Sequence, residues 1–148
     1  MKKLNFDTGI EEFEVNGAVL RFNPSDPNVY ARFVAAAEKI TDIEQQMVVK
    51  NAENSGAQVL RLMEEADRKA KDLLAEVFGS QNDFDKMFNG VNVMAVAANG
   101  ERVLTNFFYA LTPILTEGAQ KCAREQAAAV AAEVRPSGKP YKTTARGK

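Results

Sequence analysis

The chain has 148 residues and a formal net charge of −1, and 45% of its residues are hydrophobic and 26% charged. These are ordinary values for a soluble globular protein that is long enough for one domain with a core. No apolar run approaches the roughly 18–20 residues that cross a bilayer, and acidic residues follow the two N-terminal lysines, so we expect neither membrane contact nor a secretory signal.

The chain contains no histidine and a single cysteine, Cys122. The lack of histidine removes the commonest general base, the Ser–His and Cys–His pairs and the usual zinc ligand. One cysteine excludes an intramolecular disulfide and is typical of a reducing compartment; we interpret it as a bystander thiol. The acidic group at 64–67 is interpreted as a solvated helix face, and Asp83 and Asp85 lack the spacing of a calcium loop. We therefore expect no enzyme, no catalytic residue, no cofactor and no metal site.

Residues 11–22, with the sequence EEFEVNGAVLRF, predict a β-hairpin. Both arms show strand-like alternation, and the dipeptide Asn16-Gly17 between them tolerates the positive φ angles of a type I′ turn. A two-stranded hairpin is marginally stable alone, so we expect one face to pack on helices or on a neighbouring subunit.

A first amphipathic helix is predicted directly after the hairpin, over roughly 27–40. Asp26 suits the N-cap, and Pro27 fits the first turn, where its missing N–H costs nothing. Apolar residues then recur at helical spacing as far as Ile40.

A second, long helix is predicted from Thr41 to about Phe78. Thr41 and Glu44 match the capping-box pattern, and the polar stretch KNAENSGAQ predicts a bend or break near Gly56. The second half carries a narrow apolar seam with charges on its other faces; the seam is Val59, Met63, Ala66, Ala70, Leu73 and Val77, and the charges are Arg61, Glu64, Glu65, Arg68, Lys69 and Lys71. Such a seam is typical either of a core-facing helix or of a contact between subunits of a homo-oligomer.

The segment between Gly79 and Gly90 predicts a joint between helices. Gly79 suits the end of the preceding helix, Asp83 can cap a short turn over FDKMF, and Asn89-Gly90 can end that turn. The candidate residues for a joint or a partner-binding surface are Phe78, Gly79, Phe84, Met87, Phe88 and Gly90. The simplest interpretation of the aromatic residues, and of Phe107 and Phe108, is that they belong to the core.

The last third of the chain predicts further helices. Asn92 can cap a helix over VNVMAVAANG, and ERVLTNFFYALTPILTEG has the most apolar stripe, so we expect it at the centre of the core. Pro113 should kink this helix, because its ring removes one hydrogen bond and crowds the preceding turn. Residues 119–134 are rich in alanine, so they are expected to form an exposed helix or to meet a partner.

The charge is concentrated at the C-terminus. Residues 135–148 carry five of the 19 basic residues and none of the 20 acidic ones, so this stretch is +5 and residues 1–134 are −6. We predict one mainly helical, bundle-like domain over 1–134 with a small N-terminal β-hairpin, and a disordered basic tail over 135–148. The tail is either a solvated terminus or an electrostatic arm for an acidic partner or nucleic acid; its basic residues are Arg135, Lys139, Lys142, Arg146 and Lys148. Tyr141 is its only aromatic residue, which argues against sequence-specific nucleic-acid binding.

Three blocks of the sequence resemble the tail assembly chaperones of tailed bacteriophages that infect Gram-positive hosts. They are FEVNGAVLRFNPSDPNVYARF, VFGSQNDFDKMFNGVNV and NFFYALTPIL, and the likeness covers roughly residues 5–118. The resemblance implies a non-catalytic protein of the host cytoplasm that coats the helical tape-measure protein until the tail tube forms. It also implies that an extended form can arise by ribosomal frameshifting near the C-terminus, and that the 79–90 segment is a fixed joint.

Two other functions remain open from the sequence. The acidic body and the lack of catalytic motifs are also typical of a phage-encoded protein that inhibits a host defence or a host enzyme. The basic tail is compatible with a nucleic-acid-associated protein, whose binding would weaken steeply with salt.

Overall fold

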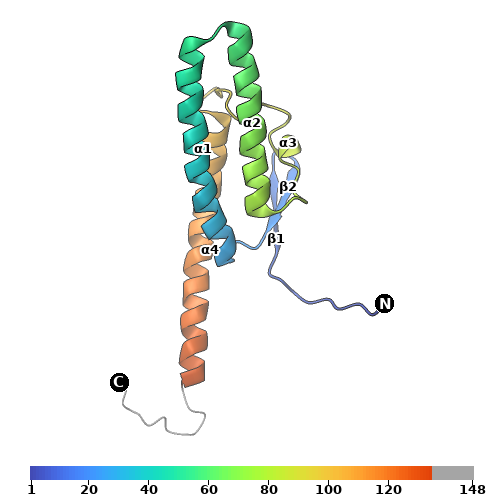
Figure 1. The fold of residues 1–148 in the computed structure, drawn as a ribbon. Helices are drawn as coiled ribbons and strands as arrows, with labels where there is room; N and C mark the ends of the chain where they lie inside the picture. The colour runs from blue at the N-terminus through green and yellow to red at the C-terminus, as the bar shows by residue number, and fades with distance from the viewer. Residues whose placement is uncertain (135–148) are drawn as a thin grey trace.

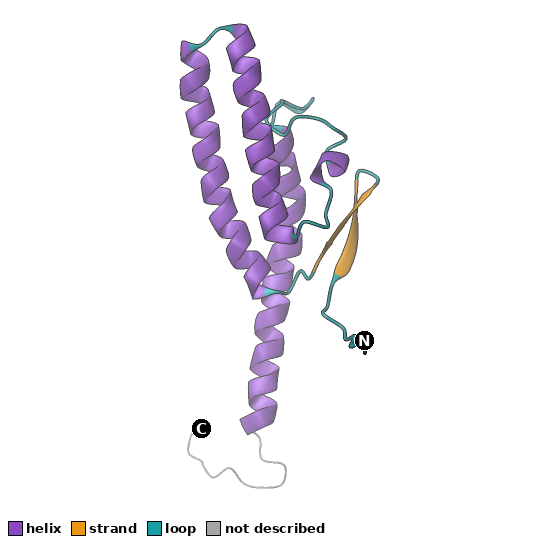
Figure 2. Cartoon of the chain, turned by 45° about the vertical axis from the view of Figure 1, so that its right-hand side comes forward, coloured by secondary structure: helices purple, strands orange, loops and turns teal. Residues whose placement is uncertain are grey.

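The computed structural model describes residues 1–134. It consists of a two-stranded hairpin and four helices: β1 (Glu11–Val15), β2 (Ala18–Phe22), α1 (Pro27–Glu53), α2 (Gly56–Phe78), α3 (Phe84–Met87) and α4 (Val103–Val134). This confirms the predicted mainly helical class with a small N-terminal hairpin. Three long helices lie side by side, with the hairpin and α3 on one flank, and α4 continues well beyond the other two (Figures 1 and 2). No helix within the described part of the chain is long and apolar enough to cross a membrane.

The hairpin forms where the sequence predicts it. Asn16 and Gly17 take φ angles of 49° and 83°, which are those of a type I′ turn, and β1 pairs with β2 in antiparallel register. Ala18, Leu20 and Phe22 are buried on one face, whereas Val19 and Arg21 between them are exposed. The alternation of the sequence therefore places one face of the hairpin against the helices.

The first helix begins as predicted but its predicted end is wrong. Asp26 accepts a hydrogen bond from the Asn28 N–H and Pro27 occupies the first turn, yet α1 continues past Ile40 to Glu53. Thr41 is not an N-cap, because its hydroxyl donates to the Ala37 carbonyl one turn earlier, inside the helix. The apolar spacing of Ile40, Ile43 and Met47 continues through this point and outweighs the local capping pattern.

The break predicted within KNAENSGAQ separates α1 from α2. The helix ends at Glu53, the chain turns at Asn54 and Ser55, and the Ser55 main-chain N–H donates to Gln58 Oε1 at 3.0 Å, in the manner of a capping box. The two helices then pack antiparallel along their length (Figure 1). Of the predicted seam, Ala66, Ala70 and Val77 are buried, Met63, Leu73 and Val59 are half-buried, and Leu74 joins them in the core.

The chain between α2 and α4 is a packed loop that holds one short helix. Asp83 caps α3 by accepting from the Lys86 N–H, and Asn89 and Gly90 leave it with φ angles of 56° and 72°. The helix predicted after Asn92 is absent from this part of the structure. Instead, Asn92 Oδ1 accepts from the Met94 N–H at 2.8 Å in a local turn, and Val93 and Met94 are buried.

The final helix supplies one wall of the core. α4 runs without interruption through Pro113 to Val134, and Leu104, Phe107, Leu111 and Leu115 are buried along one side. A chain of aromatic contacts crosses the interior from the hairpin through α2 and α3 to α4; its members are Phe22, Phe78, Phe84, Phe107 and Phe88. From Ala119 to Ala132 the helix is almost entirely exposed, as its alanine-rich composition predicts.

Candidate protein-binding surfaces

The predicted joint residues lie at the junction of α2, α3 and the hairpin. Phe78, Phe84, Met87 and Phe88 are each 5% exposed or less, so these side chains are part of the core. Gly79 has a φ of 106° and sits where α2 ends, and Gly90 follows α3. Phe107 is also buried, and the half-buried Phe108 packs edge-on against Phe33 of α1.

A polar network fastens this junction to α2. Lys71 Nζ lies 3.0 Å from Asp67 Oδ2 and 2.8 Å from Asp85 Oδ1, while Asp67 Oδ1 accepts from the Val93 N–H at 2.8 Å. The prediction that the acidic group at 64–67 is a solvated helix face is therefore wrong for Asp67, whose side chain is 18% exposed, although Glu64 and Glu65 are exposed; the Lys71 side chain is 10% exposed. Burial alone lowers the pKa of Lys71, but its hydrogen bonds to Asp85 and Asp67 and their charges raise it more, so the net pKa lies above its ordinary 10.5.

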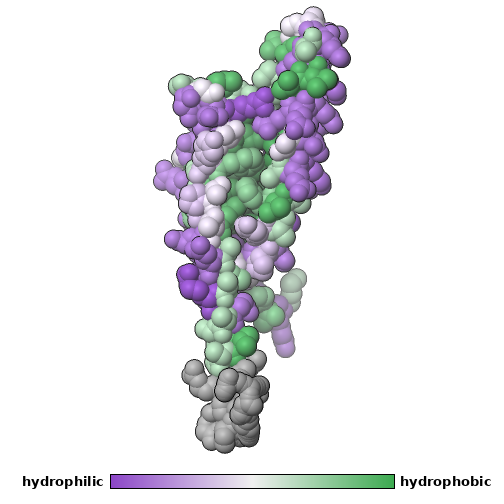
Figure 3. Space-filling view, turned by 90° about the vertical axis from the view of Figure 1, so that its left-hand side faces the viewer, coloured by the Kyte–Doolittle hydropathy of each residue, from purple (hydrophilic) through white to green (hydrophobic). Residues whose placement is uncertain are grey.

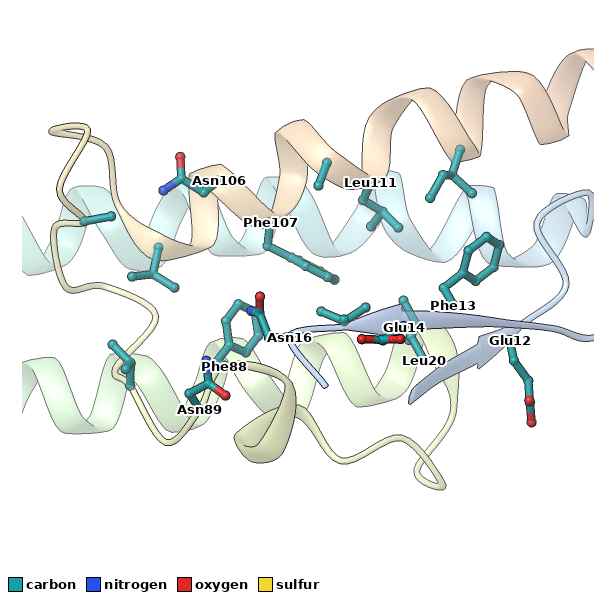
Figure 4. A pocket seen from close by; sticks show the side chains of 16 residues that line it. Glu12, Phe13, Glu14, Asn16, Leu20, Phe88, Asn89, Asn106, Phe107 and Leu111 are labelled. Atoms are coloured by element: carbon teal, nitrogen blue, oxygen red, sulfur yellow. The ribbon is translucent and has the colours of Figure 1, made fainter. Parts of the chain in front are cut away.

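An apolar groove of about 770 Å³ lies between the hairpin and α4. Phe13 points from β1 toward α4, and Phe107 points from α4 toward the hairpin (Figure 4). The five consecutive residues 12–16 line the groove, whereas Leu20 is the one residue of β2 that does so. The groove therefore runs along β1. Most of its lining surface is apolar, and its volume is within the range of small-ligand and peptide sites.

The two edges of the hairpin differ. Val15 and Ala18 flank the two-residue turn and are therefore a hydrogen-bonded pair. In an antiparallel ladder such pairs alternate with pairs that are not hydrogen-bonded to each other, and the residues of the latter point their main-chain N–H and C=O groups away from the partner strand. On β2, the outward groups of Arg21 are satisfied by the side-chain amide of Asn82, whereas those of Val19 have no partner within residues 1–134. On β1, the corresponding residues are Glu12 and Glu14, and within residues 1–134 no side chain or loop pairs with their outward main-chain groups. The edge of β1 beside the groove is thus open.

A second candidate surface is an uncharged face formed by α1 and α4. Tyr30, Val34, Thr41 and Val48 recur at steps of four and seven, so they share one side of α1, and all four are exposed. On α4, the neighbouring side carries Thr105, Tyr109, Thr112 and Thr116. Hydrophobic and weakly polar side chains gather along the middle of the molecule between strongly polar margins (Figure 3). We call these eight residues the uncharged face. Glu44 of α1, between Thr41 and Val48, lies beside them, and its carboxylate is paired with Arg102 of α4 at 3.0 Å.

The uncharged face and the groove lie on different sides of α4. The groove is lined by Asn106, Ala110 and Ile114, which follow one another at steps of four. They are offset around the helix from Thr105, Tyr109 and Thr112, so a substitution on one surface leaves the other intact.

The remaining candidates contribute little to a site in the described structure. Cys122 is a half-buried free thiol on α4, and residues 1–134 contain no cluster of acidic, cysteine or histidine side chains that could hold a metal ion. The proposed electrostatic arm, Arg135, Lys139, Lys142, Arg146 and Lys148, lies outside the described residues.

No direct signal in the sequence indicates the groove, the open edge of β1 or the role of Asn82, because each depends on segments far apart in the chain. The α1 part of the uncharged face could have been found, since Tyr30, Val34, Thr41 and Val48 are spaced at helical intervals. No protein-family model, curated protein or solved structure matches the chain. Its function is therefore inferred from its own surfaces and from the resemblance of its sequence.

Proposed function

We propose that this protein is a non-catalytic tail assembly chaperone of a tailed bacteriophage, which binds the tape-measure protein in the host cytoplasm and keeps it soluble. The resemblance of three sequence blocks supplies the identity of the partner. The observation that carries the proposal is the uncharged face of α1 and α4.

The dimensions of this face suit an amphipathic helix. Tyr30 and Val48 are 18 residues apart on α1, which corresponds to five turns and roughly 27 Å. Two packed helices leave a shallow furrow between them, and the apolar stripe of a third helix can lie in such a furrow. A long tape-measure helix exposes apolar stripes that would otherwise aggregate, and several copies of the chaperone could cover successive lengths of it.

The chemistry of the face also suits temporary binding. Its side chains are valine, tyrosine and threonine rather than a dense cluster of leucine and phenylalanine, and the exposed Val34 and Tyr30, at 44% and 48%, are already covered in part by their own chain. Each copy therefore has little apolar area to gain, so single contacts are weak and many copies act together. Such contacts can be released one at a time as the tail tube assembles.

Co-expression with the tape-measure protein of the same phage tests this function. The chaperone carries an affinity tag, and the soluble fraction is purified through it. Recovery of soluble tape-measure protein with several copies of this chain would support the proposal. If the tape-measure protein stays insoluble and this chain elutes alone, the proposal is wrong and a host partner should be sought instead.

A further inference from the structure

Residues 1–10 form an arm that precedes β1 and lies outside the folded body. Met1, Leu4, Phe6 and Ile10 are between 52% and 120% exposed, and the arm contains no helix or strand. Every second residue from position 4 to position 10 is Leu4, Phe6, Thr8 and Ile10. An extended arm would therefore present these four side chains on one side. Such a row of exposed apolar side chains is suited to a hydrophobic surface on another molecule.

The arm does not fill the groove of its own chain. The Asn23 side-chain amide donates to the Thr8 carbonyl at 3.0 Å, and the Gly9 N–H donates to Asp7 Oδ1 at 2.8 Å. These bonds hold the base of the arm beside the end of β2, and the arm projects away from the helices (Figure 1). The groove is thus left to another molecule.

We propose that the arm of a second copy of this chain adds as a strand to the open edge of β1 and places its apolar side chains in the groove. The outward main-chain N–H and C=O groups of Glu12 and Glu14 would pair with the main chain of the incoming arm. Leu4 and Phe6, two residues apart, would then point together toward Phe107 and Leu111 of α4.

The charges of arm and groove are complementary. Lys2 and Lys3 lie at the free end of the arm, and Glu12 and Glu14 line the edge of the groove. Glu12 is bound by Arg21 at 2.7 Å, whereas Glu14 makes no ion pair within residues 1–134. The lysines would therefore be drawn toward Glu14, and this contribution should weaken with added salt.

Within residues 1–134 a chain offers this arm and this groove, so exchange of arms can join copies without using the uncharged face. If two copies exchange arms reciprocally they close into a dimer, and if each arm goes to a further copy they form a row. The contact lies on the other side of α4 from the uncharged face, so the inference stands or falls independently of the proposed function.

The mass of the full chain in solution, measured by light scattering over a wide range of concentration, tests the exchange. We expect the wild-type chain to form oligomers and the Leu4→Asp/Phe6→Asp variant to be a monomer. Leu60→Asp is the matched control, because Leu60 is 71% exposed on α2, away from arm and groove. A monomeric wild-type chain, or oligomers that survive in the Leu4→Asp/Phe6→Asp variant, would overturn the proposal.

A direct binding measurement complements the mass. A fluorescent peptide of residues 1–10 is titrated into a variant that lacks residues 2–6. Its body should fold normally, because these residues are exposed and Asp7, which lines a pocket with Lys121 and Glu125 of α4, is kept. Ala110→Lys in this variant fills the groove with a positive side chain, so we expect affinity to fall about tenfold or more; Gln120→Lys, on α4 outside the groove, should leave it unchanged. Failure of the peptide to bind, or equal binding to both lysine variants, would contradict strand exchange.

Discussion

The side chain of Asn82 pairs with the main chain of Arg21 as a neighbouring strand would. Its Oδ1 accepts from the Arg21 N–H at 2.7 Å, and its Nδ2 donates to the Arg21 carbonyl at 3.1 Å. The same Nδ2 lies 2.9 Å from the Phe78 carbonyl at the end of α2. One amide thus joins the edge of the hairpin to the end of a helix, and Asn82 is 6% exposed.

Replacing Asn82 by alanine should destabilise the fold by about 2 kcal/mol, because the partly buried main-chain groups of Arg21 and the buried carbonyl of Phe78 lose their partner. Asn82→Asp should be at least as harmful, since a carboxylate cannot donate to the two carbonyls. The midpoint of urea unfolding measures both effects. Ser80→Ala, at an exposed position in the same loop, is the control; equal midpoints for Asn82→Ala and Ser80→Ala would show that the amide is dispensable.

Local signals in the sequence predicted the points where the chain turns. Asn16-Gly17, Asp26-Pro27 and Asp83 act within a few residues of themselves, and the structure uses each as predicted. The same kind of signal failed at Thr41 and Asn92. Thr41 lies within a continuous apolar stripe, and Asn92 is bound through its Nδ2 to the Met63 carbonyl of α2, so distant packing decided both conformations.

The binding surfaces required the assembled fold. The groove joins residues near position 14 to residues near position 110, and nothing in either stretch specifies the other. Asn82 likewise has its partner 61 positions earlier. By contrast, the arm and the α1 part of the uncharged face are periodic along the sequence and can be recognised in it once their role is known.

Gly118 and Gly56, both in helices, should respond in opposite ways to alanine. A glycine-to-alanine change stabilises a helix interior by roughly 1 kcal/mol, and less at the first residue, where Gly56 lies. Gly56 has open space around it, so Gly56→Ala should raise the free energy of unfolding modestly. A Cβ at Gly118 would overlap the carbonyl oxygen of Pro24, so Gly118→Ala must push α4 away from the start of α1 and should cost about 1–3 kcal/mol.

Thermal unfolding of the two alanine variants and the wild type measures this difference. The prediction concerns the sign: the melting temperature should rise for Gly56→Ala and fall for Gly118→Ala. If both variants became more stable, α4 would not approach Pro24 as closely as the structure indicates.

Stability should decline at alkaline pH through the loss of the Lys71 charge. The pKa of Lys71 in the folded protein is raised above its unfolded value of 10.5. Its contribution is therefore fully present below pH 10.5 and is lost as the pH rises through the folded pKa. Lys71→Met should be less stable than the wild type at neutral pH, and the difference between the two should narrow above pH 10.5.

Urea unfolding at several pH values measures that difference. Because tyrosines and other lysines titrate in the same range, only the comparison of wild type and variant isolates Lys71. Lys69→Met is the control, since Lys69 is exposed on the same helix; a gap that stays constant with pH would show that the charge of Lys71 does not stabilise the fold.

Charges placed on the uncharged face should abolish binding of the tape-measure protein without unfolding the chaperone. Val34 and Val48 are 44% and 58% exposed, and lysine is a better helix former than valine, so Val34→Lys and Val48→Lys should change stability little. If a bound helix covers this face, a lysine charge in place of either valine would be buried without a partner, which should cost about 1.5 kcal/mol of binding free energy, roughly tenfold in affinity. Gln46→Lys adds the same side chain at an exposed position on another side of α1 and serves as the control.

Co-purification with the tape-measure protein should survive Gln46→Lys and be lost in the double valine variant. Equal recovery in both would place the binding site elsewhere on the molecule, and a loss in both would point to net charge, rather than the uncharged face, as the cause.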